Sequence, residues 1–204
     1  MEFTLERAQG WPSARVFGVD EAGRGPWAGP VMAAAICLPE GFSLPVNDSK
    51  KLTAKKRDAL FAELVRLPHG LGAASVAEID ALNILQATFL AMTRAVDALA
   101  AEIGAPAHVL VDGNRLPKWH YPAQAVIGGD AAAPSIAAAS ILAKVTRDRD
   151  MAALDAAYPG YGWASNMGYG AKAHREGLEK LGVTPHHRRS YAPIAEILRG
   201  QTAS

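Results

Sequence analysis

The sequence predicts an α/β domain with a mixed central sheet flanked by helices. Apolar runs typical of strands alternate along the chain with segments whose apolar residues recur at helical spacing. The loop between the first two strand candidates is too short for a crossover connection, so these strands are expected to be antiparallel. A length of 204 residues suits one hydrophobic core. We expect one main domain over residues 1–184, and a basic, short helical C-terminal segment over residues 185–204 that packs on it.

The first half of the chain supplies strand and helix candidates in alternation. Residues 15–20 form the first strand and lead into the glycine-rich turn 23–26, after which residues 31–38 form the second strand. Thr53 suits the N-cap of a helix that ends near Leu67. The remaining candidates are a strand at 71–76 and one long helix over 78–103, which Gly104 ends.

The second half repeats this alternation. The apolar run 108–112 ends on an aspartate, and the run 124–127 leads through two glycines to Asp130. Pro134 suits the first turn of a helix that continues to about Leu154. A glycine-rich loop, a helix over 171–181 and a polar, basic tail complete the chain.

Charge and composition argue against several classes of protein. Half the residues are hydrophobic and the formal net charge is +1, so the chain lacks the strongly basic body of a non-specific nucleic-acid binder. Contact with nucleic acid would need local basic clusters, whose more common role is a solvated surface. Cys37 is the single cysteine, so no internal disulfide can form. The N-terminus lacks the pattern of a signal peptide, and no apolar stretch reaches the roughly 18 residues that cross a bilayer. We therefore expect a cytoplasmic protein with no membrane partner.

Acidic residues stand at the ends of three strand candidates: Asp20 with Glu21, then Asp112, then Asp130. In open α/β sheets, ligands collect at the carboxyl ends of strands. Carboxylates gathered there repel one another unless cations intervene, and hard divalent ions such as Mg²⁺ or Mn²⁺ prefer oxygen ligands. Two such ions about 3.5–4 Å apart can promote phosphodiester hydrolysis. The pattern predicts a metal-dependent nuclease.

Each of these acids also has a simpler interpretation. Asp and Asn are common after strands because they form turns, and the Asp-Gly-Asn run at residues 112–114 is by itself such a turn. Glu21 presents a geometric difficulty as well. Adjacent residues of a strand point to opposite faces, so Glu21 can share a site with Asp20 only where the strand ends or bulges.

The glycines of residues 23–28 offer a rival interpretation, because they loosely match a dinucleotide-binding loop. Such a loop must open a helix whose N-terminus holds the pyrophosphate. Here Pro26 interrupts the loop and a strand-like run follows it. The two carboxylates before the loop would also repel phosphates, so this interpretation is rejected.

Eight separated blocks of the chain carry a resemblance to a known family. They are residues 18–26, 47–52, 80–85, 111–114, 129–130, 138–148, 167–170 and 186–190. In this order they resemble bacterial ribonuclease HII, the type 2 ribonuclease H. The resemblance implies a ribonuclease H-like fold and a two-metal site with Mn²⁺ or Mg²⁺ as cofactor. The implied catalytic and metal-binding residues are Asp20, Glu21, Asp112 and Asp130. Asp148 competes for the fourth place, but its position inside a predicted helix favours a supporting role.

The resemblance also implies an activity. Members of the family are endoribonucleases that hydrolyse the RNA strand of RNA–DNA hybrids. They also cut on the 5′ side of a ribonucleotide embedded in duplex DNA, leaving a 3′-hydroxyl and a 5′-phosphate, an activity associated with ribonucleotide excision repair. The expected partners are therefore RNA–DNA hybrids and ribonucleotide-containing duplex DNA, and the expected state is a monomer.

By the same resemblance, the turn Gly23-Arg24-Gly25 reads the ribonucleotide and its 2′-hydroxyl, and Tyr169 packs on the sugar of the next deoxynucleotide. Glycines allow backbone groups to approach a ligand closely, and the 2′-hydroxyl is what separates RNA from DNA. The residues expected to hold backbone phosphates are Ser49, Lys50, Lys51, Ser140, Lys144, Arg188 and Arg189.

Two departures from the family pattern affect basic residues. Gly128-Gly129 stands where the family commonly has Lys-Gly, and Asn166-Met167 stands where it commonly has His-Lys. Both changes would weaken substrate affinity or alter its salt dependence. Two other functions stay open: a related two-metal nuclease that acts on DNA, and a non-catalytic module that binds hybrids.

Overall fold

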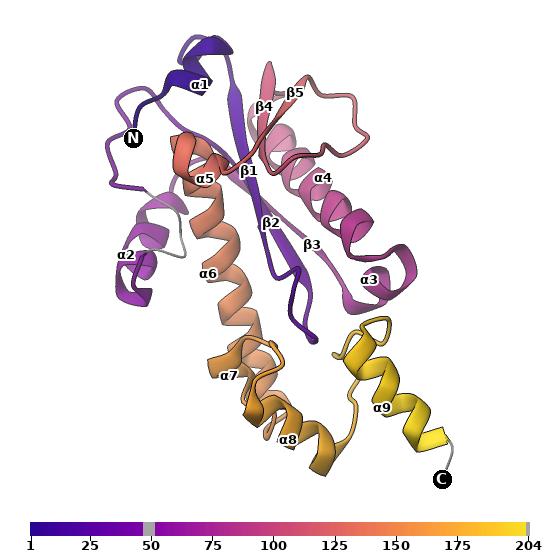
Figure 1. Ribbon diagram of the computed structural model, residues 1–204. Coiled ribbons are helices and arrows are strands. Elements are labelled where there is room, and N and C mark those ends of the chain that lie inside the picture. Colours follow the sequence, from indigo (N-terminus) through magenta and orange to yellow (C-terminus); the bar gives the residue numbers. More distant parts are fainter. Residues whose placement is uncertain (47–51, 203–204) are drawn as a thin grey trace.

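The computed structural model describes residues 1–46 and 52–202. Within these ranges, one five-stranded sheet has the order β3-β2-β1-β4-β5 (Figure 1). β1 is antiparallel to β2 and parallel to β4, so the sheet is mixed, as the short first loop predicts. The strands are β1 (Val16–Ala22), β2 (Val31–Cys37), β3 (His69–Ala74), β4 (His108–Asp112) and β5 (Ala123–Val126).

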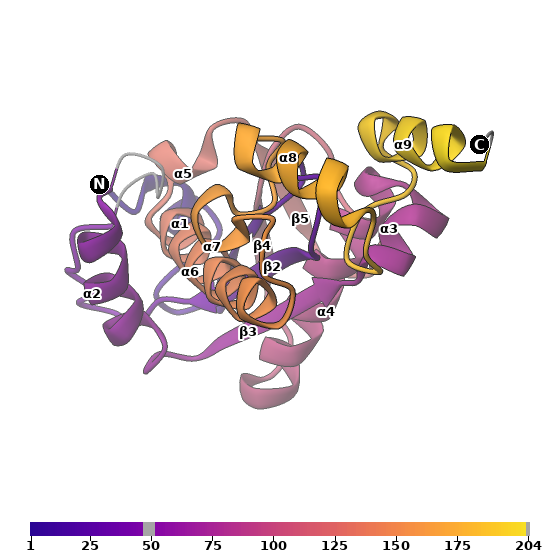
Figure 2. The same ribbon diagram turned by 90° about the horizontal axis from the view of Figure 1, so that it is seen from below.

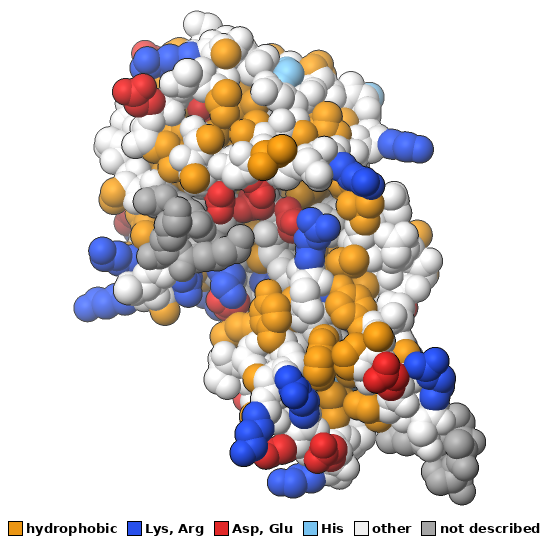
Figure 3. All heavy atoms as spheres, viewed as in Figure 1, with side chains coloured by type: hydrophobic (Ala, Val, Ile, Leu, Met, Phe, Trp, Pro, Cys, Tyr) orange, Lys and Arg blue, Asp and Glu red, His pale blue; other side chains and the backbone are white. Residues whose placement is uncertain are grey.

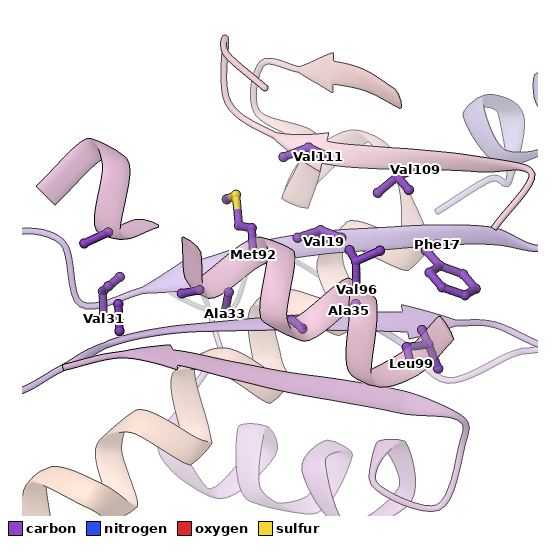
Figure 4. Packing of buried hydrophobic residues seen from close by; sticks show 14 of the residues in the cluster. Phe17, Val19, Val31, Ala33, Ala35, Met92, Val96, Leu99, Val109 and Val111 are labelled. Carbon is purple, nitrogen blue, oxygen red and sulfur yellow. The ribbon is translucent and has the colours of Figure 1, made fainter. Parts of the chain in front are cut away.

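Two long helices cover the two faces of the sheet. α4 (Ile84–Ile103) packs on β1, β2 and β3, and α6 (Pro134–Ala157) packs on β1 and β2 from the other side (Figure 2). Glycines allow this close approach, since a Cβ on Gly72 would lie 2.2 Å from the carbonyl oxygen of Ala91 in α4. A Cβ on Gly18 would lie 2.2 Å from the carbonyl carbon of Ser135 in α6. The α4 face of the core contains Phe17, Val19, Val31, Ala33, Ala35, Met92, Val96, Leu99, Val109 and Val111 (Figure 4).

Shorter helices complete the structure. α7 and α8 lie at the far end of α6, where Ala28, Met151, Trp163 and Leu178 form a separate buried cluster (Figure 1). The basic tail contains a helix, α9, whose Ile194 is buried in the same cluster. The short helices are α1 (Thr4–Ala8), α2 (Ala54–Leu64), α3 (Val76–Leu82), α5 (Gly129–Ala132), α7 (Trp163–Asn166), α8 (Lys172–Leu181) and α9 (Ala192–Thr202). A domain boundary between residues 184 and 185 stays a prediction.

The single long helix expected over residues 78–103 is wrong, because Asn83 divides it into α3 and α4. Asn83 has a φ of 70°, outside the helical region, and its side chain accepts hydrogen bonds from the backbone N–H groups of Leu85 and Gln86. Of these two helices, α3 also begins earlier than expected, since Ser75 and Glu78 form a capping box at its start. Asn tolerates positive φ and caps helices well, so it can end one helix and begin the next.

The expectation that no segment is apolar enough to cross a bilayer is also wrong. By length and composition, α4 is long and apolar enough to do so. In the structure, however, Ala87, Ala91 and Ala95 of this helix are fully buried against the sheet. Its apolar composition therefore has an ordinary explanation in the core.

Glu6 of α1 is expected to stabilise the start of α6. The N-cap residue Ala133 has no polar side chain, and the buried Glu6 carboxylate accepts instead from the backbone N–H (2.9 Å) and hydroxyl (2.6 Å) of Ser135. Glu6→Ala should lower the free energy of unfolding by about 1–3 kcal/mol, because these buried donors lose their acceptor. Urea denaturation measures this, with the exposed Glu2→Ala as a control that should change stability by less than about 0.5 kcal/mol. Equal stability of the two variants would contradict the capping role.

Candidate active site

The acids of β1 and β4 meet at one edge of the sheet. These strands are parallel neighbours in a register that pairs Val19 with Val111, so Asp20 and Asp112 both follow the last paired residues. Oxygen atoms of Asp20, Glu21 and Asp112 all lie within 4.8 Å of one another. We call these three residues the carboxylate cluster. Segments 92 residues apart in the sequence thus place their charges together, as the strand-end pattern predicts.

Asp20 and Glu21 share the cluster although β1 does not end there. β1 continues to Ala22 beside β2, but its pairing with β4 stops at Val19, which leaves the β4 side open. The carboxylate of Asp20 turns along the strand and accepts the backbone N–H of Glu21 at 2.7 Å. The expectation that the strand must end or bulge is therefore wrong. What the two neighbours need is a free edge of the strand and a side chain at residue 20 that turns toward the N–H of residue 21.

Burial and mutual repulsion disfavour the charged forms of Asp20 and Glu21. Burial raises the pKa of Asp20 well above its usual range, and the charges of Glu21 and Asp112 raise it further. Burial also raises the pKa of Glu21, opposed by the Arg24 guanidinium, which lies 3.2 Å from it. The hydroxyl of Ser140 in α6 hydrogen-bonds the Asp20 carboxylate. Three crowded oxygen donors of this kind are the ligand set that hard divalent cations prefer, so the residues fit a metal site.

Asp130 lies beside the cluster without being one of its three converging acids. It is half-buried in the short helix α5. The backbone N–H of the preceding residue, Gly129, donates to the Asp112 carboxylate at 2.7 Å, which ties α5 to the cluster. Metal ligation by Asp130 stays a prediction. Asp148, the other candidate for the fourth metal ligand, forms an ion pair with Lys144 at 2.7 Å within α6.

A cavity of about 590 Å³ opens beside Asp20 and Glu21. The turn residues Gly23, Arg24 and Gly25 line it, together with Ser140, Lys144 and Tyr169. In Figure 3, acidic side chains gather in a hollow in the middle of the face, with basic side chains around it. Tyr169 is 51% exposed, and its ring lies only 3.2 Å from the position that a Cβ on Gly25 would occupy. The absence of a side chain at this glycine therefore leaves room for the tyrosine.

The comparison with known families shows which family this chain belongs to. The family model described as Ribonuclease HII matches residues 17–194, most of the chain. The chain belongs to the ribonuclease HII family. It is thus a ribonuclease H, a metal-dependent endonuclease.

Relatives and solved structures agree with this family. The ribonuclease HII of Sphingopyxis alaskensis is 59% identical over 183 residues, which cover 89% of this chain and 91% of the relative. The crystal structure of ribonuclease H2 from Pyrococcus horikoshii is 28% identical with a TM-score of 0.75, over 93% of this chain and 100% of that one. Bst-RNase HIII in complex with Mn²⁺ is 18% identical with a TM-score of 0.72, over 97% of this chain and 73% of that one, and shows the likeness of fold.

Only some of the residues predicted to hold backbone phosphates line the cavity of this ribonuclease HII family member. Ser49, Lys50 and Lys51 lie outside the described residues. Arg189 is exposed, and its backbone N–H donates to Asp80 at 3.0 Å. Ser140 and Lys144 do line the cavity, where Ser140 is buried against Asp20 and Lys144 is paired with an acid.

Arg188 differs from the expectation of a phosphate contact. It is fully buried, and its guanidinium donates to the backbone carbonyls of Gly23 (2.5 Å), Arg24 (2.8 Å) and Gly29 (3.0 Å). A side chain used in this way holds the glycine turn from behind. Because a buried position is inaccessible to a phosphate, the exposed neighbour Arg189 is the better candidate for that contact.

Arg147 is a further buried arginine that sequence reasoning missed. From α6 it donates to the carbonyls of Pro30 (2.9 Å), Met167 (3.0 Å) and Ala28 (3.1 Å). It thereby links the segment after the glycine turn to the segment before Tyr169. The sequence offers one signal for its burial, a charged residue on the otherwise apolar side of the helix. Its hydrogen-bond partners could not be predicted, because they are backbone carbonyls far away in the chain.

Acid is expected to destabilise the protein through His187. Burial, and then the charge of His174, lowers the pKa of His187 to about 4. An unfolded histidine titrates near 6.5, so below that pH the unfolded chain binds a proton that the native state does not. The stabilisation is complete above about pH 6.5 and falls by about 2 kcal/mol on going down to about pH 5.

His187→Asn provides the comparison, because the contributions of groups that do not contact His187 largely cancel between the two proteins. Urea unfolding at several pH values should show the wild-type advantage shrinking with acid. A stability difference that stays constant with pH would contradict the role of His187.

Proposed function

We propose that the protein hydrolyses the RNA strand of RNA–DNA hybrids and cuts on the 5′ side of single ribonucleotides in duplex DNA. The products would carry a 3′-hydroxyl and a 5′-phosphate. The observation that carries this proposal is the position of the carboxylate cluster in one cavity with the turn Gly23-Arg24-Gly25 and Tyr169. The protein would act as a monomer in the cytoplasm.

Asp20, Glu21 and Asp112 would hold divalent ions, with Asp130 as the fourth ligand. When bound, two such ions supply activation of a water molecule and neutralisation of charge on the scissile phosphate. Either Mn²⁺ or Mg²⁺ suits a site of carboxylate oxygens. The raised pKa values of Asp20 and Glu21 support this proposal, since nearby cations would favour the charged carboxylates.

The glycine turn would read the ribonucleotide. Glycines at positions 23 and 25 leave the backbone open to a sugar, and Arg24 lies between them, paired with Glu21. Tyr169 stands against Gly25 with half its surface exposed, in a position to pack on the next sugar. Lys144, partly exposed at the cavity, and Arg189 would contact backbone phosphates.

Three labelled duplexes test this function with added Mg²⁺ or Mn²⁺: all-DNA, DNA with one embedded ribonucleotide, and a full RNA–DNA hybrid. We expect cleavage of the hybrid and a single cut 5′ of the embedded ribonucleotide, with the all-DNA duplex intact. Cleavage of the all-DNA duplex would instead indicate a DNA nuclease. Binding of the hybrid without products in either metal would indicate a non-catalytic module. If only the full hybrid is cut, the proposed reading of junctions by the glycine turn and Tyr169 is wrong.

A further inference from the structure

His174 and His187 form a buried pair behind the cavity. Both side chains are fully buried, and their Nε2 atoms lie 3.0 Å apart. Nδ1 of His174 lies 2.9 Å from the carbonyl oxygen of Tyr169, and Nε1 of Trp163 lies 3.1 Å from Nε2 of His174. On the other side, the backbone N–H of Thr184 donates to Nδ1 of His187 at 2.9 Å. The pair therefore joins α8 and the 184–187 segment to the segment that carries Tyr169.

The neighbours fix one tautomer for each ring. Because Nδ1 of His187 accepts from Thr184, the proton of this ring is on Nε2, which donates to His174. Nε2 of His174 faces the N–H groups of Trp163 and His187, which share its one lone pair, so the proton of this ring is on Nδ1, which donates to the Tyr169 carbonyl. Each ring thus acts as both donor and acceptor, and the chain of bonds ends on the backbone of Tyr169.

The same pair is connected to the glycine turn. His187 directly precedes Arg188, whose backbone N–H donates to the carbonyl of Trp27 at 2.8 Å and whose guanidinium holds the carbonyls of Gly23 and Arg24. His187 also forms an isolated β-bridge with Ala28. The contact between the histidines is therefore a direct link between the side of the cavity that holds the turn and the side that holds Tyr169.

We propose that His174 and His187 are positioning residues that hold Tyr169 against the turn Gly23-Arg24-Gly25. The pair thereby sets the efficiency of cutting at a single ribonucleotide. This inference rests on the proposed function, in which the tyrosine packs on the sugar after the ribonucleotide. Neither histidine lines the cavity, so both act through Tyr169 and not on the substrate.

Two substitutions of His174 separate positioning from bulk packing. His174→Phe keeps an aromatic ring but has no donor for the Tyr169 carbonyl. His174→Asn leaves a smaller side chain, but its amide N–H can occupy the place of Nδ1 and donate to that carbonyl. We expect His174→Phe to lower kcat/KM on the single-ribonucleotide duplex by about tenfold or more, and His174→Asn to retain most of it. If kcat/KM falls further in His174→Asn than in His174→Phe, the loss of side-chain volume explains the effect and the inference is overturned.

A double-mutant cycle with Tyr169→Ala gives the second readout. If His174 acts through Tyr169, His174→Phe should cost less than about twofold once the tyrosine ring is gone. Equal losses in both backgrounds would mean that His174 has only a structural role. His187→Asn, which can still accept from Thr184, enters the same cycle if His174→Phe does not fold, as judged by thermal melting. If wild type does not cut this duplex, or Tyr169→Ala cuts it normally, the proposed function fails. If wild type cuts this duplex and Tyr169→Ala is impaired, but the effects of the two substitutions are additive, only the positioning role of His174 is removed.

Discussion

Asp112→Asn is expected to lower single-turnover cleavage of the one-ribonucleotide duplex by roughly 10³-fold or more while the fold persists. Asparagine keeps the volume of the side chain and an oxygen that can accept the Gly129 N–H, which now donates to Asp112 at 2.7 Å. It removes one negative charge from a cluster whose oxygen atoms lie within 4.8 Å of one another. If that charge attracts divalent ions, as proposed, metal binding and turnover should fall together.

Thermal melting distinguishes this loss of function from misfolding. Without added metal, Asp112→Asn should melt no lower than wild type, since the Asp112 charge raises the pKa values of both Asp20 and Glu21. With Mn²⁺ or Mg²⁺, wild type should gain stability by mass action and the variant should gain much less. Asp97→Asn is the matched control, because this exposed aspartate of α4 accepts from the Tyr121 hydroxyl at 2.8 Å and lies outside the cluster. Near-normal turnover of Asp112→Asn would remove Asp112 from the site.

The meeting of Asp20 and Asp112 followed from the sequence because it depends on local signals. Each residue follows a short apolar run, and parallel neighbours bring their carboxyl ends to the same edge of a sheet. The antiparallel first hairpin followed in the same way from a loop too short to cross over. The place of Glu21 did not follow, since it depends on where the pairing with β4 stops and on the Asp20 side chain turning toward the N–H of Glu21.

The burial of Arg147 and Arg188 could not be predicted, because arginine is rarely fully buried and its targets here are backbone carbonyls from distant segments. Periodicity gives the faces of a helix but not the loops that will need donors. The helix break at Asn83 was missed for a related reason. A capping side chain and a continuing apolar pattern both fit the same residues, and only the observed φ of 70° decides between them.

The two positions at which the sequence is expected to depart from its family, Gly128 and Asn166, both have defined backbone roles in the structure. Asn166 donates from its side-chain amide to the carbonyl of Tyr161 at 2.8 Å and accepts from the N–H of Gly168 at 2.9 Å. It therefore shapes the segment before Tyr169 without carrying charge. Gly128 has a φ of 66°, a left-handed conformation in which glycine is less strained than lysine. Both residues therefore serve the local backbone geometry and carry no charge.

Arg188→Met is expected to be among the most destabilising single changes in this protein, lowering the free energy of unfolding by about 3–5 kcal/mol. Methionine can fill much of the space but donates no hydrogen bond. The carbonyls of Gly23, Arg24 and Gly29 would lose a donor in a buried setting. Since two of these groups belong to the glycine turn, cleavage at a single ribonucleotide should fall even among molecules that remain folded. Urea denaturation and cleavage rates at low temperature, corrected for the folded fraction, measure the two effects.

Arg189→Met is the matched control, because it removes the same charge one residue away from an exposed position. Its stability should stay within about 0.5 kcal/mol of wild type. If Arg189 contacts a phosphate, binding should weaken for every duplex alike, and the slope of log affinity against log salt should become shallower by about one. The opposite pattern, with Arg188→Met stable and altered mainly in salt dependence, would return Arg188 to the phosphate contacts. We expect Arg188→Met to be the destabilising variant, because the buried Arg188 guanidinium already donates its hydrogen bonds to backbone carbonyls and has no need of a substrate phosphate.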